Sequence, residues 1–165
     1  MLVCNFSKQL SDSVNTVQML VGFFSLVLGA VFYIIDRSPN TYFIWLSGLD
    51  INKINLNCFG LIGDVFADFV HTYAFILLTC GFLSCGKKGL LWITIGWLGF
   101  DLLMETGQYY PQMFVTLVPK WFDTVPFFEN TQNFFRYGTF DPADIVAIIC
   151  GAIMGYCTAF ILNKK

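Results

Sequence analysis

Four apolar stretches, each close to the ~20 residues that a helix needs to cross a bilayer, constrain the fold of this 165-residue chain more than any other feature. They lie near 15–35, 65–85, 89–109 and 143–162. Hydrophobic side chains make up 56% of the sequence, more than is typical of a soluble domain. The sequence therefore predicts one all-α membrane domain over residues 1–165, a polytopic bundle of about four transmembrane helices.

The basic residues at the ends of these stretches predict an orientation. They are Lys8, Lys87, Lys88, Lys164 and Lys165. The positive-inside rule places such residues in the cytoplasm, so both termini are expected there, as an even number of spans requires. Segments 36–64 and 110–142 then face outward, and their density of basic residues is lower.

The outward segment 110–142 is rich in aromatic residues and is interrupted by Pro111, Pro119 and Pro126. Tyrosine and tryptophan favour the membrane–water interface, which supports a segment lying among the headgroups. Irregular backbone also occurs at membrane depth where protein or water satisfies its polar groups, which supports a re-entrant cap. Both interpretations stay open, with the interfacial one favoured.

Composition excludes several classes of function. The net charge of −2, without a basic stripe, gives no indication of a nucleic-acid partner. The six cysteines include no C-x-x-C pair and no cysteine–histidine cluster, so neither a metal site nor another cofactor is expected.

Polar side chains recur inside the apolar stretches at spacings that bring them to one helix face. The three stripes are Asp64, Asp68 and His71; Asp101, Glu105 and Gln108; and Asp144, Gly151 and Gly155. A charged side chain near the bilayer centre costs roughly 2.5–3.5 kcal/mol on insertion scales. These residues therefore need partners, water or a function.

Each stripe also has a purely structural interpretation. Asp64 and Asp68 suit the start of a helix, where the dipole favours carboxylates. His71 is either a packing residue or a group that titrates near neutral pH. The residues of the second stripe could form polar contacts that hold two helices together. Its two carboxylates would repel each other unless one holds a proton or a cation such as Arg136 neutralises them.

The third stripe follows an apparent helix start. Asp141 before Pro142 is typical of an N-cap followed by proline at the first helical position. Gly151 and Gly155 form a G-x-x-x-G face that allows another helix to approach closely. Asp144 shares that face, so it is expected to face a neighbouring helix, with Arg136, His71 or a ligand as its partner.

The order of these motifs resembles the VanZ-like membrane proteins over roughly residues 60–160. The matching stretches are DVFADFVHTYAFILL, DLLMETGQYYP and FRYGTFDPADIVAIICGAIMGY. The resemblance implies a small multi-pass protein of the bacterial cytoplasmic membrane, in a family with some members associated with resistance to teicoplanin-type glycopeptides. Its polar positions correspond here to Asp64 or Asp68 with His71, to Glu105 with Gln108, to Arg136, and to Asp144 with the two glycines. It implies no established reaction.

Three hypotheses of function follow. In the leading one, an outward polar pocket binds an envelope lipid or a cell-wall precursor; Arg136 contacts an anionic group, while His71, Glu105 and Asp144 orient or protonate it. In the second, the chain is a structural subunit with a membrane-protein partner or a second copy. In the third, less favoured, His71 is the general base of an intramembrane hydrolase that uses activated water, because the sequence has no G-x-S-x-G motif.

Overall fold

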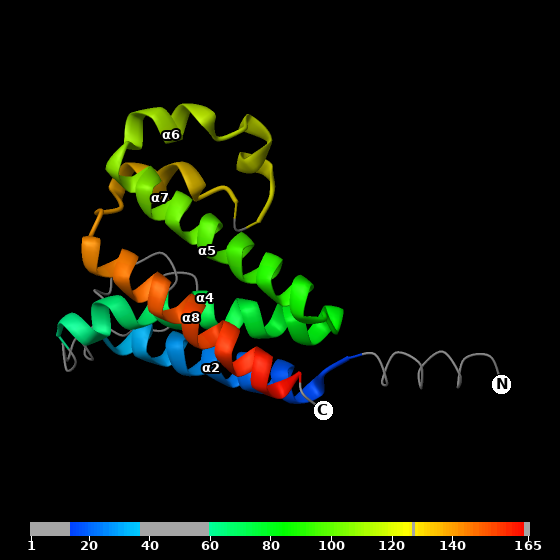
Figure 1. Ribbon diagram of the computed structural model, residues 1–165. Coiled ribbons are helices and arrows are strands. Elements are labelled where there is room, and N and C mark those ends of the chain that lie inside the picture. Colours follow the sequence, from blue (N-terminus) through cyan, green and yellow to red (C-terminus); the bar gives the residue numbers. More distant parts are fainter. Residues whose placement is uncertain (1–13, 37–59, 127, 164–165) are drawn as a thin grey trace.

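The computed structural model describes residues 14–36, 60–126 and 128–163, and this part of the chain is helical without strands. Its elements are α2 (Thr16–Asp36), α4 (Leu61–Leu83), α5 (Lys87–Tyr109), α6 (Pro111–Leu117), the 3₁₀ helix η1 (Lys120–Thr124), α7 (Thr131–Tyr137) and α8 (Pro142–Leu162) (Figure 1). The long helices α2, α4, α5 and α8 coincide with the four predicted stretches to within about a turn. The all-helical fold class is thus confirmed for the described residues.

Three of the four long helices are long and apolar enough to cross a membrane. Within the described residues these are α2, α4 and α8. Helix α5 has the required length of 23 residues, but it also carries Lys87, Lys88, Asp101 and Glu105. The membrane character of the chain therefore rests on three helices, and a fourth crossing by α5 is a finer prediction.

Local sequence explains where the long helices begin and end. Asp141 is the N-cap of α8, where its Oδ1 atom accepts a hydrogen bond from the Ala143 N–H at 2.8 Å, and Pro142 opens the helix. Both features agree with the sequence prediction. Ser84 ends α4 in the left-handed conformation, with φ 46°, and the chain turns at once into α5.

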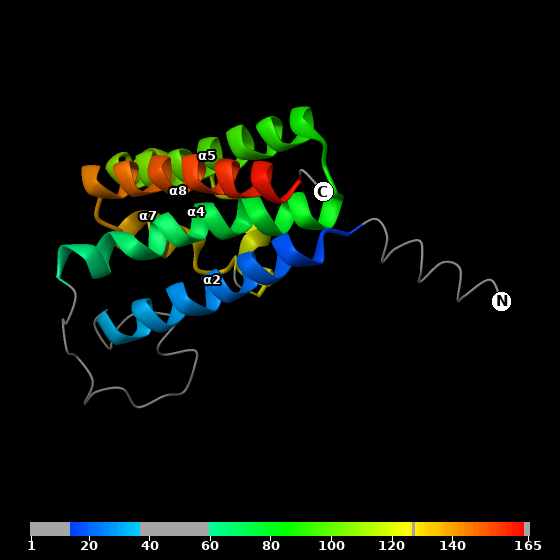
Figure 2. The ribbon, with the colours of Figure 1, turned by 60° about the horizontal axis from the view of Figure 1, so that its bottom comes forward.

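Helix α4 lies at the centre of the bundle, with α2 on one side and α8 on the other (Figure 2). Helix α5 packs beside α8 and contacts α4 as well. The core at this junction consists of Ile76, Leu77, Cys80, Leu90, Ala152 and Ala159. Helix α5 runs in the direction opposite to both α4 and α8, so α4 and α8 run parallel to each other (Figure 1).

Glycines set how closely α2 and α8 approach α4. A Cβ atom on Gly29 of α2 would lie 2.8 Å from Val70, and one on Gly151 of α8 would clash with the carbonyl oxygen of Phe69. Backbones at this separation gain van der Waals contact that larger side chains would prevent. The G-x-x-x-G face is therefore occupied by α4 of the same chain.

Polar side chains hold the start of α2 against the end of α8. The buried Gln18 Nε2 donates to Ala159 O and to Asn163 Oδ1, both at 3.0 Å, while Asn15 Nδ2 donates to Leu162 O at 3.3 Å. Asn163 Nδ2 in turn donates to Cys85 O, at 3.2 Å, in the α4–α5 turn. The start of α2, this turn and the end of α8 thus lie at one end of the bundle. Of the basic residues used to predict the orientation, Lys8, Lys164 and Lys165 lie outside the described residues.

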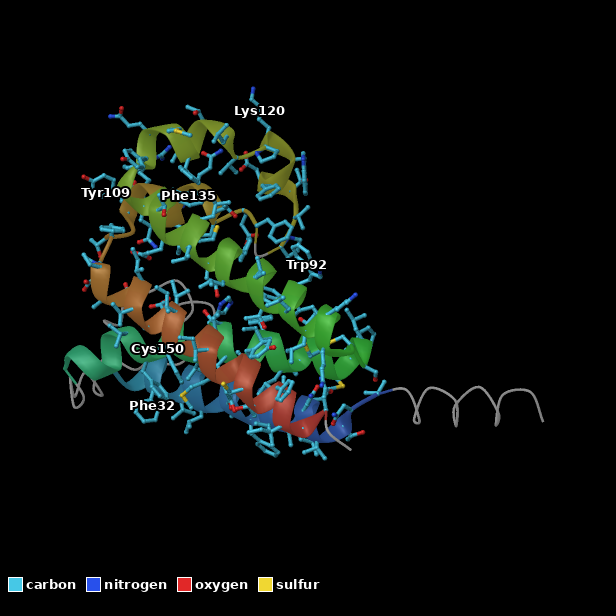
Figure 3. All side chains as sticks on the ribbon, in the orientation of Figure 1. Phe32, Trp92, Tyr109, Lys120, Phe135 and Cys150 are labelled. Atoms are coloured by element: carbon cyan, nitrogen blue, oxygen red, sulfur yellow. The ribbon has the colours of Figure 1, made fainter. Side chains whose placement is uncertain are left out.

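Helices α6, η1 and α7, which we call the arm, lie on the side of α5 away from α2 (Figure 1). Helices α6 and α7 pack on each other through Phe114 and Phe135, whose ring centroids are 5.1 Å apart. Phe135 lies where α7 meets α5, and Lys120 lies at the outer side of the arm (Figure 3). The arm doubles back beside α5, and several of its aromatic side chains are exposed, including Trp121 and Tyr137.

Candidate functional site

The centre of the candidate site is a buried carboxylate on α5 that meets two side chains of α4. Asp101 is 6% exposed, and its Oδ1 atom lies 3.3 Å from His71 Nδ1. The Thr72 hydroxyl lies 2.5 Å from Asp101 Oδ2, which accepts its hydrogen bond. Both carboxylate oxygens therefore face polar groups from the neighbouring helix, which a buried carboxylate requires.

His71 lies between this carboxylate and the surface. Its side chain is 43% exposed. Its ring packs against Phe75, at a centroid distance of 4.5 Å, and stands edge-on to Trp97 at 6.3 Å. The indole N–H of Trp97 donates to Thr79 Oγ1 at 3.0 Å, which fixes the Trp97 ring between α4 and α5. One edge of the imidazole is thus directed at Asp101, while part of the ring stays accessible.

Glu105 lies one turn further along α5 and serves a different set of partners. It is 4% exposed. Its Oε1 atom accepts a hydrogen bond from the Asp141 N–H at 3.0 Å, and its Oε2 atom accepts one from Gln108 Nε2 at 3.1 Å. Glu105 therefore joins the end of α5 to the start of α8.

The other predicted acidic residues lie on α4 and at the start of α8. Asp144 is buried in the first turn of α8 and lies near enough to Glu105 to act on it electrostatically. Asp68 is half-buried, one turn before Thr72 on α4. Asp64 lies on α4, and its side chain is outside the described part of the structure.

Arg136 does not take the place that was predicted for it. It is exposed on α7, and within the described residues no ion pair joins it to Asp101 or Glu105. The physical reason is that nearer groups already satisfy both carboxylates: His71 and Thr72 for Asp101, and Gln108 and the Asp141 N–H for Glu105.

Two predicted packing residues meet α4 directly. Gly151 faces the backbone of Phe69, and a Cβ atom on Gly155 would lie 3.2 Å from Ile76 Cδ1. The shared face of Asp144, Gly151 and Gly155 is buried, as a stripe directed at another helix should be.

The chemistry of the site follows from the pairing of an acid with an imidazole. A carboxylate oxygen beside Nδ1 accepts a hydrogen bond from an N–H on that atom and so fixes the orientation of the ring. The Nε2 atom is then the one that remains to accept or donate a hydrogen bond to a ligand. Among the described residues, no group of three or more histidine, cysteine or acidic side chains could hold a metal ion.

One hollow among the described residues lies away from His71 and Asp101. It is an open apolar depression on the outer face of α2, lined by Val17, Leu20, Val21, Phe24, Ser25 and Leu28. Of the residues predicted to line a polar pocket, Asp101 and Glu105 are buried and hydrogen-bonded, while His71 is more accessible.

Sequence reasoning missed Thr72 and Gln18, both fully buried. A threonine inside an apolar helix usually bonds to its own backbone, and the Thr72 hydroxyl does lie 3.2 Å from Asp68 O. A signal for Thr72 was its position directly after the only histidine. A signal for Gln18 was that it is an uncharged polar residue near the start of a span.

Comparisons with protein-family models, curated proteins and solved structures find no match to this chain.

Proposed function

We propose that this chain is a multi-pass protein of the bacterial cytoplasmic membrane, with four crossings, both termini in the cytoplasm and a VanZ-like arrangement of polar residues. Its His71–Asp101 pair binds the polar headgroup of an envelope lipid or of a lipid-linked cell-wall precursor. The observation that carries the proposal is the 3.3 Å contact between a half-exposed imidazole and a buried carboxylate on a neighbouring helix.

Energetics favour a functional role for this pair over simple packing. Burying a carboxylate in an apolar bundle is expensive, and the contacts of Asp101 with His71 and Thr72 must offset the cost of its desolvation. His71 does not seal that carboxylate off, because 43% of its side chain remains exposed. An exposed imidazole that a buried acid holds in place is able to recognise a phosphate, since a ring N–H donates a charge-assisted hydrogen bond to an anionic oxygen.

Arg136 supports recognition of an anionic group. It is an exposed cation on α7, and its neighbour Phe135 packs against Gly107 near the end of α5. A polyprenyl diphosphate or a phospholipid carries the anionic headgroup that these residues would recognise.

Lipid binding is tested directly with protein in nanodiscs. The parent protein should retain polyprenyl diphosphate in native mass spectrometry, and Asp101→Asn and His71→Gln should each weaken retention by about tenfold, the loss expected for one charge-assisted contact. Gln112→Ala, which changes an exposed residue of α6, is the control. The proposal would be contradicted if the parent protein retained polyprenyl diphosphate no better than phosphatidylcholine, or if both site variants retained it as well as the parent protein does.

The resemblance to VanZ-like proteins adds a cellular readout. A Gram-positive host that expresses the chain should become less susceptible to teicoplanin, and His71→Ala at matched membrane abundance should remove the shift. An unchanged susceptibility in the presence of lipid binding would separate the chain from the resistance-associated members and leave the binding function in place.

A hydrolase is the second candidate, and the same pair favours it. Asp101 lies at Nδ1 of His71, as the orienting acid of a general base does. The base would remove a proton from water, which would attack a lipid ester and release an acid and an alcohol. Release of either product from the bound lipid, lost in His71→Gln, would favour catalysis over binding.

A structural subunit remains the third candidate. Gly151 and Gly155 contact α4 of the same chain, so the face that the sequence offered to a partner is already used. The outer face of α2, with exposed Phe23 and Phe24, is one apolar surface that a membrane-protein partner or a second copy could contact.

A further inference from the structure

We infer that the end of α5 is a latch for the arm: Glu105 and Gln108 position α6, η1 and α7 beside α5, and loss of this latch releases the arm as a unit while the helix bundle stays folded. This role is separate from the proposed headgroup binding at His71 and Asp101, and it assigns Glu105 and Gln108 of the second stripe to the control of a movable element.

The arm has little stability of its own. Helices α6 and α7 contain seven residues each, and isolated helices shorter than about 12 residues are marginal in water. None of the residues of α6 or η1 is fully buried, and Phe135 is the buried residue of α7. Contacts with α5 must therefore supply most of the order in the arm.

The last turns of α5 supply those contacts. Gly107 lies against both aromatic residues of the arm core, because a Cβ atom there would clash with Phe135 and lie 2.8 Å from Phe114. Tyr109 packs edge-on against Phe140, at a centroid distance of 5.1 Å. These contacts hold the arm at both of its connections to the bundle.

The linker between α7 and α8 is held to α5 by polar contacts of Glu105 and Gln108. Glu105 Oε1 accepts from the N–H of Asp141, the residue that caps α8. Glu105 Oε2 accepts from Gln108, whose side-chain oxygen lies so close to Gly138 that a Cβ atom there would clash with it. The linker between α7 and α8 is thus clamped to one buried carboxylate and to the glutamine that the carboxylate holds.

Once the contacts of Glu105 and Gln108 are lost, two short connections would allow the arm to move as a unit. Tyr110 forms the whole connection from α5 to α6, with its N–H donating to Thr106 O at 3.3 Å. Gly138 is extended and begins the return to α8. Elements with few buried contacts open at a free-energy cost well below that of global unfolding.

Amide hydrogen exchange on the protein in nanodiscs tests the latch. Glu105→Ala should raise the exchange of amides in residues 131–141 by about tenfold, the effect of one lost charge-assisted hydrogen bond, and leave α2 and α4 within twofold of the parent protein. Glu105→Gln keeps a carbonyl acceptor for the Asp141 N–H and should restore much of the protection. Asp123→Asn, an exposed acid-to-amide change in η1, is the matched control and should have no effect.

Gly138→Ala keeps the inference testable if Glu105→Ala does not fold. The added methyl group would clash with the Gln108 side chain and with the carbonyl oxygen of Phe134, so it would displace the linker while leaving Glu105 intact. The same local rise in exchange is expected. Faster exchange that spreads equally through α2, α4 and α8 would show that Glu105 is general packing and not a latch. Unchanged exchange in residues 131–141 would also overturn the inference, and neither result depends on lipid binding.

Discussion

At the level of single residues, Asp101 depends on neighbours from another helix. Its Oδ2 atom accepts a hydrogen bond from Thr72, a residue with no exposed surface. Burial makes this bond more important than its net strength suggests, because the oxygen cannot turn to water when the donor is lost. The stability of the site therefore rests partly on a residue that would not contact a ligand.

Thr72→Val preserves the shape of the side chain and removes the hydroxyl. We expect a destabilisation of about 1–3 kcal/mol, the cost of leaving a buried polar atom unpaired. Thermal unfolding in detergent measures it, with Thr116→Val as the control because the Thr116 hydroxyl is exposed and bonds to its own helix, at Met113 O. Equal effects of the two changes would mean that the Thr72 bond contributes nothing specific.

The candidate site residues could be identified from the sequence, but their partners could not. His71, Asp101 and Glu105 stood out because charged groups in apolar helices are costly. Arg136 was predicted as the cation that neutralises Asp101 and Glu105, whereas the fold supplies these two carboxylates with a histidine, a hydroxyl, an amide side chain and a backbone N–H. Such choices depend on tertiary distance, which spacing along one helix does not contain.

At the level of elements, glycines decide how tightly the helices pack. Gly151 of α8 faces the backbone of Phe69. A Cβ atom on Gly99 of α5 would instead meet no other atom within 4 Å. The two residues have the same intrinsic cost in a helix, so their different surroundings allow a matched comparison.

Gly151→Ala should destabilise the bundle by about 1–3 kcal/mol, because the new methyl group must push α8 away from a backbone oxygen. Gly99→Ala should instead leave stability unchanged or raise it by up to about 1 kcal/mol through better helix propensity. Thermal unfolding of both variants in the same detergent provides the measurement. A stable Gly151→Ala protein would show that α4 and α8 separate at little cost.

Long helices were predictable and short ones were not. The apolar runs gave the four long helices, and Asp141 with Pro142 gave the start of α8. Segment 110–142 offered only aromatic residues and prolines, since a helix of seven residues is too short for a periodic pattern. Its doubling back beside α5 depends on Gly107 and Gly138, whose role appears only once Phe135 and Gln108 are in place.

At the scale of the whole molecule, connectivity constrains the number of membrane crossings. Asn15 and Asn163 tie the start of α2 and the end of α8 to the α4–α5 turn, at one end of the bundle. Helix α5 leaves this end and α8 returns to it (Figures 1 and 2). If α2, α4 and α8 cross the membrane in this arrangement, α5 must cross as well, despite its polar residues.

Cysteine labelling distinguishes four crossings from three. In a variant with the six native cysteines replaced, Ser84→Cys and Thr139→Cys place single exposed thiols at opposite ends of the bundle. With four crossings, an impermeant maleimide should label Thr139→Cys in intact cells, and Ser84→Cys should react only after the membrane is opened, as should a cysteine added at the C-terminus.

A protein with three crossings would give another pattern. Helix α5 and the arm would stay on the side of Ser84, so Thr139→Cys would be protected in intact cells and the C-terminal cysteine would be labelled. That result would place Asp101 and Glu105 outside the bilayer, where ionised carboxylates cost little, and it would remove the energetic argument for a functional pair. Labelling of Thr139→Cys would instead place both carboxylates on a crossing helix, where their retention needs the partners that α4 and the start of α8 provide.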